Sequence, residues 1–573
     1  MTNPARLLRF FALYYSLVEA AVLSEARSPG LSPRASSNAS ACTGNTANDR
    51  SVWCDYDIST NYYDEVPDTG VTVEYWFELQ NVTVSPDGVS RNALTVNGSF
   101  PGPTIEANWG DTVKVHLVNS LTNNGTSLHF HGVRQNWTNS MDGVASITQC
   151  PVAPGDSITY TWRATQYGSS WYHSHFSLQA WEGVLGGILI HGPATADYDV
   201  DLGIVFLNDW DHQTVDELYS YAETQGPPTL DTGLINGTNV WEDGGSYFET
   251  SMESGKSYRM RLVNGAADTH FDFMIDNHTM QVIASDFVPI LPYYTDVLSI
   301  GMGQRYDIIV NANMSDVAEN FWIRAVPDSY CSENDNSNHI RGILHYDSST
   351  GTPTTSYPDY DENNCAGESS HNIVPYLSID AGSSASSSDD MAVTIEKNSA
   401  NLFKWYIGGT TFLVDWSDPT AQQVLDNTTN FSDSSAVIEL STADEWYYLI
   451  IETTLAVPHP IHIHGHDFWI LASGDGTYAS AAPALNTSNP PRRDVAMLPG
   501  SGYLVIALIA DNPGAWLCHC HIAWHTSEGF DLQFVERKEE MLDMYDATRL
   551  QETCNGWDEY VEDADVVQED SGV

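Results

Sequence analysis

The chain has 573 residues, several times the size of an ordinary domain, so two to four domains are expected. Its 22 Lys and Arg residues against 76 Asp and Glu residues give a formal net charge of −54, which excludes nucleic acid and anionic membranes as main partners because both require a basic face. Hydrophobic residues make up 42% of the chain and charged residues only 17%, so the composition supports large cores and excludes a wholly disordered chain.

The first residues predict a secreted protein. Arg6 and Arg9 precede an apolar run over residues 10–18, and a small-residue cleavage site follows that run. We therefore expect a signal peptide over residues 1–20, then a propeptide and N-terminal extension over 21–69. The alternative, a buried N-terminal helix, lacks a capping residue. Eleven Asn-x-Ser/Thr glycosylation acceptors agree with the secretory route: Asn38, Asn81, Asn97, Asn124, Asn136, Asn236, Asn277, Asn313, Asn427, Asn430 and Asn486.

Short alternating segments dominate the rest of the chain. Residues 71–77 and 112–117 alternate apolar and polar side chains, and Asn, Gly and Pro residues separate such segments. This pattern is typical of β-sandwiches or barrels. No stretch approaches the roughly 20 apolar residues of a membrane-spanning helix, so no membrane partner is expected.

Changes in composition divide the chain. A Ser- and Asp-rich segment over residues 378–390 predicts an exposed linker, and the run His191-Gly192-Pro193 marks an earlier break. We therefore expect β-domains over residues 70–195, 196–377 and 391–555, followed by an acidic tail over 556–573.

Histidines supply the strongest chemical signal. With 19 His residues, chance would place about 0.6 pairs two positions apart, whereas the chain has five. On a strand, residues i and i+2 share a face, so each pair presents two imidazoles to one point. The pairs form two groups about 300 residues apart, which favours a shared metal centre over independent structural pairs. They are His129/His131, His173/His175, His462/His464, His464/His466 and His519/His521.

The last pair brackets a cysteine, Cys520. Imidazole with thiolate suits copper or zinc, and two His with one Cys and a weak axial position form the blue-copper arrangement. Zinc fits poorly, because no second Cys stands at the Cys-x-x-Cys type of spacing with the usual His partners. The pattern therefore favours copper.

Four segments together resemble the signatures of the multicopper oxidases: residues 129–132, 171–175, 459–466 and 519–525. The resemblance spans roughly residues 70 to 540, and the runs 489–495 and 570–573 make it most similar to the laccases of ascomycete fungi. It implies an all-β fold of three consecutive cupredoxin-like Greek-key β-domains. It also implies a secreted, monomeric laccase with four copper ions, which couples one-electron oxidation of phenols and aromatic amines to the four-electron reduction of dioxygen to water.

The resemblance assigns each matching residue to a copper. His459, Cys520 and His525 match the ligands of the type 1 copper. Phe530 takes the axial position, where ascomycete relatives usually carry Leu; it cannot ligate, which should raise the potential. The remaining matches are His129 and His462 for the type 2 copper, His131, His173 and His521 for one type 3 copper, and His175, His464 and His519 for the other. His466 matches no ligand, so it is expected to support its neighbours.

The resemblance also pairs the cysteines. Without the ligand Cys520, seven of the eight cysteines remain, an odd number for an oxidising compartment. The family pairing leaves Cys518 as a buried free thiol. The implied disulfides are Cys42–Cys54, Cys150–Cys554 and Cys331–Cys365.

Three carboxylates are candidates for moving protons. Asp142 matches the acid that orients solvent near the type 2 copper, and Asp231 matches a residue that accepts the phenolic proton. Many basidiomycete laccases carry an Asp where this chain has Ala523, so Asp570 in the tail is the expected replacement. The terminal Asp-Ser-Gly-Val resembles a plug in the solvent channel to the copper cluster, where the cationic metal would keep Asp570 ionised.

Two other functions remain open. Another multicopper oxidase, such as a pigment-pathway oxidase or a ferroxidase, would share the ligand set. A copper-binding protein without turnover is the second alternative, although storage does not require the bridge that Cys520 makes. Oxygen uptake with a phenol, compared with Fe²⁺, separates the three.

Overall fold

The computed structural model describes residues 42–357, 360, 362–385, 387–564, 566, 568 and 570–573. The predicted signal peptide and the acceptor Asn38 lie outside the described residues. In the described part of the chain strands dominate, and no helix there is both long and apolar enough to cross a membrane.

Residues 72–191 form two four-stranded sheets, called here the first sandwich. In β6, alternate side chains are buried, so Val113, Val115 and Leu117 share a core with Ile105 of the other sheet. One sheet has the order β4 (Arg91–Val96), β3 (Thr72–Val84), β6 (Thr112–Asn119), β8 (Ser157–Arg163), and the other β5 (Gly102–Asn108), β10 (Leu185–His191), β9 (Gly168–His173), β7 (His129–Phe130).

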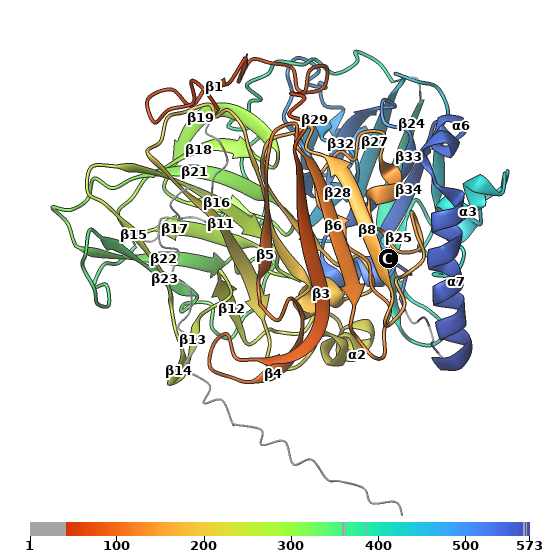
Figure 1. The fold of residues 1–573 in the computed structure, drawn as a ribbon, viewed down its shortest axis with the longest axis horizontal. Helices are drawn as coiled ribbons and strands as arrows, with labels where there is room; N and C mark the ends of the chain where they lie inside the picture. Colours follow the sequence, from red (N-terminus) through yellow and green to blue (C-terminus); the bar gives the residue numbers. More distant parts are fainter. Residues whose placement is uncertain are drawn as a thin grey trace, which may run out of the picture.

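Residues 200–346 form the middle sandwich, shown from yellow to green in Figure 1. Its six-stranded sheet has the order β12 (Thr232–Ile235), β11 (Val200–Trp210), β16 (Ser257–Asn264), β21 (Arg305–Asn311), β18 (Met280–Ser285), β19 (Val288–Thr295). Its five-stranded sheet has the order β15 (Phe248–Met252), β23 (Arg341–Tyr346), β22 (Asn320–Pro327), β17 (Phe271–Ile275), β20 (Leu298–Ile300). Helix α2 (Val215–Gln225) begins at a capping box formed by Thr214 and Glu217.

Residues 387–536 form the last sandwich, shown from cyan to blue in Figure 1. One sheet has the order β25 (Phe403–Ile407), β24 (Ser387–Lys397), β27 (Trp446–Thr453), β32 (Gly502–Ile509), β29 (Phe468–Asp475), β30 (Arg492–Arg493). The other has the order β26 (Val437–Leu440), β34 (Asp531–Glu536), β33 (Gly514–Cys520), β28 (His459–Ile463), β31 (Val495–Leu498). In all three sandwiches, strands that are neighbours in a sheet are mostly not consecutive in the chain. One hydrophobic cluster contains buried residues of both the middle and the last sandwich, for example Phe271 and Phe534. The fold is all-β with three cupredoxin-like units, as predicted.

The remaining elements of the described chain are short, except for helix α7. They are β1 (Val52–Trp53), β2 (Tyr56–Asp57), β13 (Val240–Trp241), β14 (Gly244–Gly245), α1 (Gln179–Glu182), α3 (Thr420–Leu425), α4 (Tyr478–Ala481), α5 (Ala523–Ser527), α6 (Lys538–Met541) and α7 (Ala547–Ala564), with single 3₁₀ turns at Asn139–Met141, Asp433–Ser435 and Leu542–Met544.

Three segments differ from their sequence-based description. Trp53, Ile58 and Tyr62 of the predicted N-terminal extension are buried in the core of the first sandwich. The end of the predicted linker belongs to β24, which pairs in parallel with β27 from Ser387 onward. The first part of the predicted tail continues helix α7, whose buried residues Leu550, Cys554 and Trp557 share one face. In the first and third segments, apolar side chains pack into a core that composition alone does not reveal, whereas the end of the linker is placed by its pairing with β27.

The disulfides Cys42–Cys54, Cys150–Cys554 and Cys331–Cys365 are all present, which confirms the predicted pairing. Cys518 is free and buried. The second disulfide joins positions 404 residues apart, so it fastens helix α7 to the first sandwich. The chain that follows α7 is thereby held near the interface of the first and last sandwiches.

Candidate metal centres

Three side chains meet in a mononuclear site inside the last sandwich. His459 opens β28, Cys520 ends the antiparallel neighbour β33, and His525 lies in the single turn of α5. Cys520 Sγ lies 3.5 Å from His525 Nδ1 and 3.9 Å from His459 Nδ1, and the two Nδ1 atoms are 3.3 Å apart. All three side chains are buried. Burial lowers the pKa of His459 to about 3 and that of His525 well below its usual range, so both imidazoles stay neutral with lone pairs free for a metal.

Aromatic rings cover this site. The centre of the Phe530 ring lies 5.1 Å from that of the His459 ring, and the Trp405 ring, tilted by 41°, lies 4.1 Å from the His525 ring. The indole Nε1 of Trp405 donates a hydrogen bond to the buried Glu528 carboxylate at 3.1 Å. The site therefore offers a metal two nitrogens and one sulfur, and the apolar Phe530 ring lies close to both histidines.

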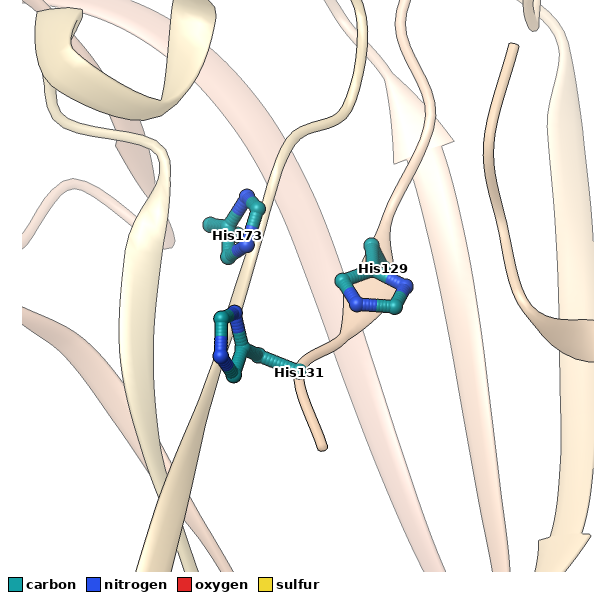
Figure 2. A group of neighbouring side chains, drawn as sticks. All are labelled: His129, His131 and His173. Atoms are coloured by element: carbon teal, nitrogen blue, oxygen red, sulfur yellow. The ribbon is translucent and has the colours of Figure 1, made fainter. Parts of the chain in front are cut away.

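Eight further histidines meet where the first and last sandwiches face each other. In the first sandwich β7 pairs with β9, which places His129 opposite His173; in the last sandwich β28 pairs with β33, which places His462 opposite His519. Figure 2 shows His129, His131 and His173 close together where β7 and the residue after it meet the end of β9. Ligand atoms come together in the groups His129/His131/His173, His129/His462/His464 and His175/His464/His519, and the ring of His521 lies 5.1 Å from that of His131.

Some ring nitrogens of the clustered histidines are hydrogen-bonded to the protein, and others are buried without a partner. The Nδ1 atoms of His129 and His462 donate to the carbonyls of Asp142 and Asp494 at 2.8 and 2.7 Å, while their Nε2 atoms are buried without a partner. His175 and His521 have no partner on either ring nitrogen. Burial and mutual repulsion lower the pKa values of His131, His173, His175, His462, His464 and His521 well below the usual range. Neutral imidazoles with unpartnered, buried nitrogens fit copper well.

Two carboxylates orient these histidines. Asp142 accepts from His464 Nδ1 at 2.9 Å and lies 3.2 Å from His129 Nδ1, so it stands beside the cluster as predicted. Asp494 accepts from His131 Nε2 at 3.2 Å. Sequence reasoning included Asp494 only within a run of family resemblance and gave it no role. His466 is bonded through both nitrogens, to the His464 carbonyl and to Glu536, which leaves it no lone pair for a metal.

In this structure the carboxylate of Asp231, the sequence-based candidate for accepting the phenolic proton, is bonded to His212. Its carboxylate accepts from His212 Nδ1 at 2.8 Å and from the His212 backbone at 3.0 Å, and none of its described contacts reaches His459, Cys520 or His525. Asp268, which sequence reasoning missed, accepts instead from the indole Nε1 of Trp524 at 3.2 Å, one residue before His525. Burial and the nearby Asp209 carboxylate raise the pKa of Asp268 well above its usual range.

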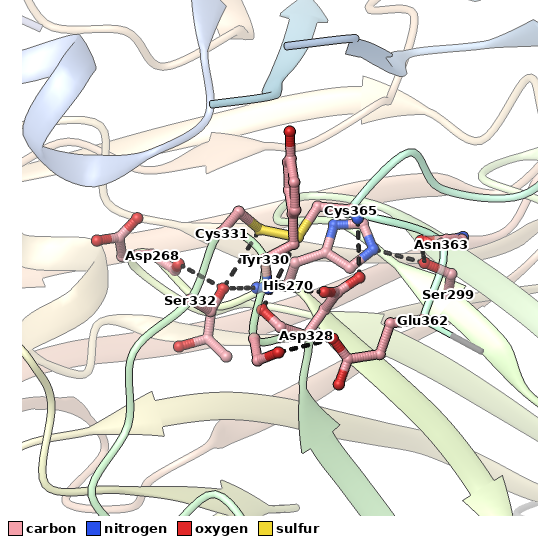
Figure 3. The surroundings of a disulfide bond; sticks show 12 residues. Asp268, His270, Ser299, Asp328, Tyr330, Cys331, Ser332, Glu362, Asn363 and Cys365 are labelled. Carbon is pink, nitrogen blue, oxygen red and sulfur yellow. Dashed lines mark hydrogen bonds between the residues drawn. A yellow bond between two sulfur atoms is a disulfide. The ribbon is translucent and has the colours of Figure 1, made fainter. Parts of the chain in front are cut away.

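The disulfide Cys331–Cys365 supports the loop that carries Asp268 (Figure 3). Ser332 Oγ donates to the Asp268 carbonyl at 3.3 Å and accepts from the His270 backbone at 3.0 Å. Both sulfurs near His270 are therefore committed to the disulfide, and this His/Cys group is no metal site.

The last four residues are buried rather than solvated. Asp570 is 6% exposed and bonds the Ser177 hydroxyl, and Gly572 donates back to its carboxylate at 3.0 Å. The Ser571 backbone donates at 3.0 Å to the carbonyl of Ser527, which ends the helix that carries His525. Burial raises the pKa of Asp570 above that of an ordinary Asp.

Comparison with known proteins agrees with this geometry. Models described as multicopper oxidase match residues 78–195, 201–349 and 410–540. Laccase-2 of Botryotinia fuckeliana is 45% identical over 98% of both chains, and the laccase of Cryphonectria parasitica is 39% identical over 98% of this chain and 100% of its own. The crystal structure of the laccase from Botrytis aclada aligns with a TM-score of 0.89 at 46% identity, covering 92% of this chain and 100% of that one.

The chain therefore belongs to the multicopper oxidase family and binds copper. Within that family its activity is that of a laccase, which confirms the resemblance seen in the sequence. Fet3p, a multicopper oxidase that functions in iron import, is more distant, with a TM-score of 0.77 and 27% identity over 85% of this chain.

Proposed function

We propose that this laccase holds four copper ions and oxidises phenols and aromatic amines. The type 1 copper would be held by His459, Cys520 and His525. The other three would be held by the eight clustered histidines in the division given above: His129 and His462; His131, His173 and His521; His175, His464 and His519. Copper bound at these sites supplies one-electron acceptance from the phenol and delivery of four electrons to dioxygen.

One observation carries this proposal: the strand β33 serves both sites. Side chains alternate between the two faces of a strand, so Cys520 turns toward His459 and His525 while His519 and His521 turn toward the cluster. The backbone on either side of Cys520 thus joins the two sites through a few covalent bonds. A protein that only stores copper has no need of such a link.

Oxygen uptake tests the function. With a phenol or an aromatic amine, we expect rapid oxygen uptake by the copper-loaded enzyme, and only slow uptake with Fe²⁺. Faster uptake with Fe²⁺ than with any phenol would favour a ferroxidase. No uptake with any donor, despite full copper loading, would favour a copper-binding protein.

We expect Asp268 to accept the phenolic proton, because its carboxylate is hydrogen-bonded to the indole of Trp524, the residue that precedes His525. Asp268→Asn should lower kcat/KM for a phenol by roughly tenfold to a hundredfold, while leaving oxidation of ferrocyanide, which loses no proton, nearly unchanged. Asp231→Asn is the matched comparison, since its carboxylate bonds His212 instead. If Asp231→Asn causes the larger loss with phenols, the sequence-based choice of Asp231 is correct and Asp268 is not the acceptor.

We expect Phe530 to set the type 1 potential. Phe530→Met would place a soft thioether beside the copper and should lower the potential by on the order of tens of millivolts, because an axial donor favours Cu(II). A redox titration of the blue absorption measures this shift. Phe534→Met is the matched control: this buried ring packs on Tyr447 instead, so the potential should not move. An unchanged or higher potential in Phe530→Met would refute the axial position.

We propose secretion as a monomer. The N-terminal pattern and the glycosylation acceptors support secretion, and the three disulfides suit an oxidising compartment. Sedimentation of the secreted, copper-loaded enzyme, together with N-terminal sequencing, tests both statements.

A further inference from the structure

The middle sandwich supplies none of the proposed copper ligands, yet it forms a wall of the cluster. Gly303, in the turn between β20 and β21, has a φ of +78°, and a Cβ atom there would lie 2.8 Å from His521 Cδ2 and 3.2 Å from His131 Cε1. Two histidines proposed for one type 3 copper are therefore packed directly against this turn.

Arg305, two residues further along, forms two hydrogen bonds with the carboxylate of Asp494, which orients His131. Its side chain is fully buried, and Nη1 and Nη2 donate to the two oxygens of Asp494 at 2.5 and 2.6 Å. Asp494 Oδ1 also accepts from His131 Nε2 at 3.2 Å, and the Asp494 carbonyl accepts from His462 Nδ1 at 2.7 Å. A fork of two charge-assisted bonds fixes both the place and the plane of a carboxylate.

A second carboxylate, that of Asp286, joins strand β21, which begins at Arg305, to the segment that carries Arg493 and Asp494. Asp286 accepts from the backbone of Arg305 at 2.9 Å and from the backbone of Asp494 at 3.1 Å. It also accepts from Nη2 and Nε of Arg493 at 3.0 and 3.1 Å. The loop after His131 leaves no spare room either, since a Cβ atom at Gly132 would meet Arg305 Nη2 and Asp494 Oδ2 at 2.4 Å. The Arg305–Asp494 pair is thus enclosed by the backbone that carries the histidines.

We propose that Arg305 is a positioning residue for the copper cluster. By holding Asp494, Arg305 fixes the hydrogen bond from His131 Nε2–H, which leaves the unpartnered Nδ1 of that ring available for copper. It also holds the segment whose carbonyl, on Asp494, bonds His462. The middle sandwich therefore takes part in copper binding without giving a ligand. This inference rests on the proposed ligand set, in which His131 and His462 bind copper.

Arg305→Lys keeps the positive charge but removes the fork. We expect the variant to bind copper at the cluster roughly tenfold to a hundredfold more weakly, the range typical of groups that orient metal ligands. The type 2 electron paramagnetic resonance signal and the copper content per chain should both fall, while the blue type 1 absorption stays. The control is Arg261→Lys: Arg261 is buried in the same sandwich and forks onto Asp201, and its other side-chain bonds go to Ser169 and Asp307 rather than to a cluster histidine or Asp494. It should lose stability but keep both copper signals.

Full cluster copper in Arg305→Lys, with no more than the drop in Tm that Arg261→Lys shows, would overturn the proposal. If Arg305→Lys is not recovered folded, Asp494→Asn decides, because the amide keeps the volume of the carboxylate and should also lose cluster copper; full loading in this variant overturns the proposal as well. His131→Ala tests the ligand set itself. If that variant keeps the whole cluster, the proposed ligand assignment fails rather than the role of Arg305.

Discussion

Cys520→Ser is expected to abolish the blue absorption and to reduce phenol oxidation to below about one thousandth of the wild-type rate. A serine hydroxyl is a harder and weaker ligand than a thiolate, so the site formed with His459 and His525 loses both its copper and its link to the neighbouring histidines. The eight histidines of the cluster are untouched, so type 2 and type 3 copper should remain largely loaded. Absorption spectra, copper content and oxygen uptake measure the three effects.

Cys518→Ser is the matched control for this change. Cys518 lies two residues earlier in β33, is buried and free, and belongs to the hydrophobic core rather than to any group of convergent ligand atoms described for the mononuclear site. It should lower stability while keeping the blue colour and the turnover. A Cys520→Ser enzyme that stays blue would remove Cys520 from the type 1 site.

The largest effect away from the ligands is expected at the C-terminus. Deleting residues 570–573, or adding residues after Val573, should lower turnover with dioxygen by roughly tenfold to a hundredfold and change the KM for a phenol little. The tail is buried and bonds Ser177, two residues after the proposed ligand His175, so it would place a carboxyl group with a raised pKa near the proposed cluster.

Asp570→Asn separates proton supply from packing, because the amide keeps the shape of the carboxyl group but carries no exchangeable acid. It should lose turnover as the deletion does. Asp558→Asn makes the same change on the exposed face of helix α7 and should have no effect. Full turnover and full copper in the deleted, extended and Asp570→Asn enzymes would show that the tail only fills space.

Local patterns predicted most of the residues that converge in the candidate metal centres. Histidines two positions apart share a strand face, so pairs such as His129/His131 and His519/His521 indicate convergence without any knowledge of the fold. Their meeting across two sandwiches depends on pairings between β7 and β9 and between β28 and β33, which join residues far apart in the chain. The family resemblance supplied those pairings; periodicity alone could not.

Groups that act through long-range contacts escaped prediction. Asp494 and Arg305 are 189 residues apart, and no spacing rule brings them together. Asp268 stands in a loop whose path depends on a disulfide and on Trp524. Helix α7 was different: Leu550, Cys554 and Trp557 already show helical spacing, but the boundary expected at residue 555 divided this helix between the last β-domain and the acidic tail.

The stoichiometry of oxygen uptake tests the central claim most directly. If Cys520 and its neighbours connect a one-electron site to a cluster that reduces dioxygen fully, about four molecules of a simple phenol should be oxidised for each dioxygen consumed, with no hydrogen peroxide released. Two phenols per dioxygen, with hydrogen peroxide accumulating, would contradict the account.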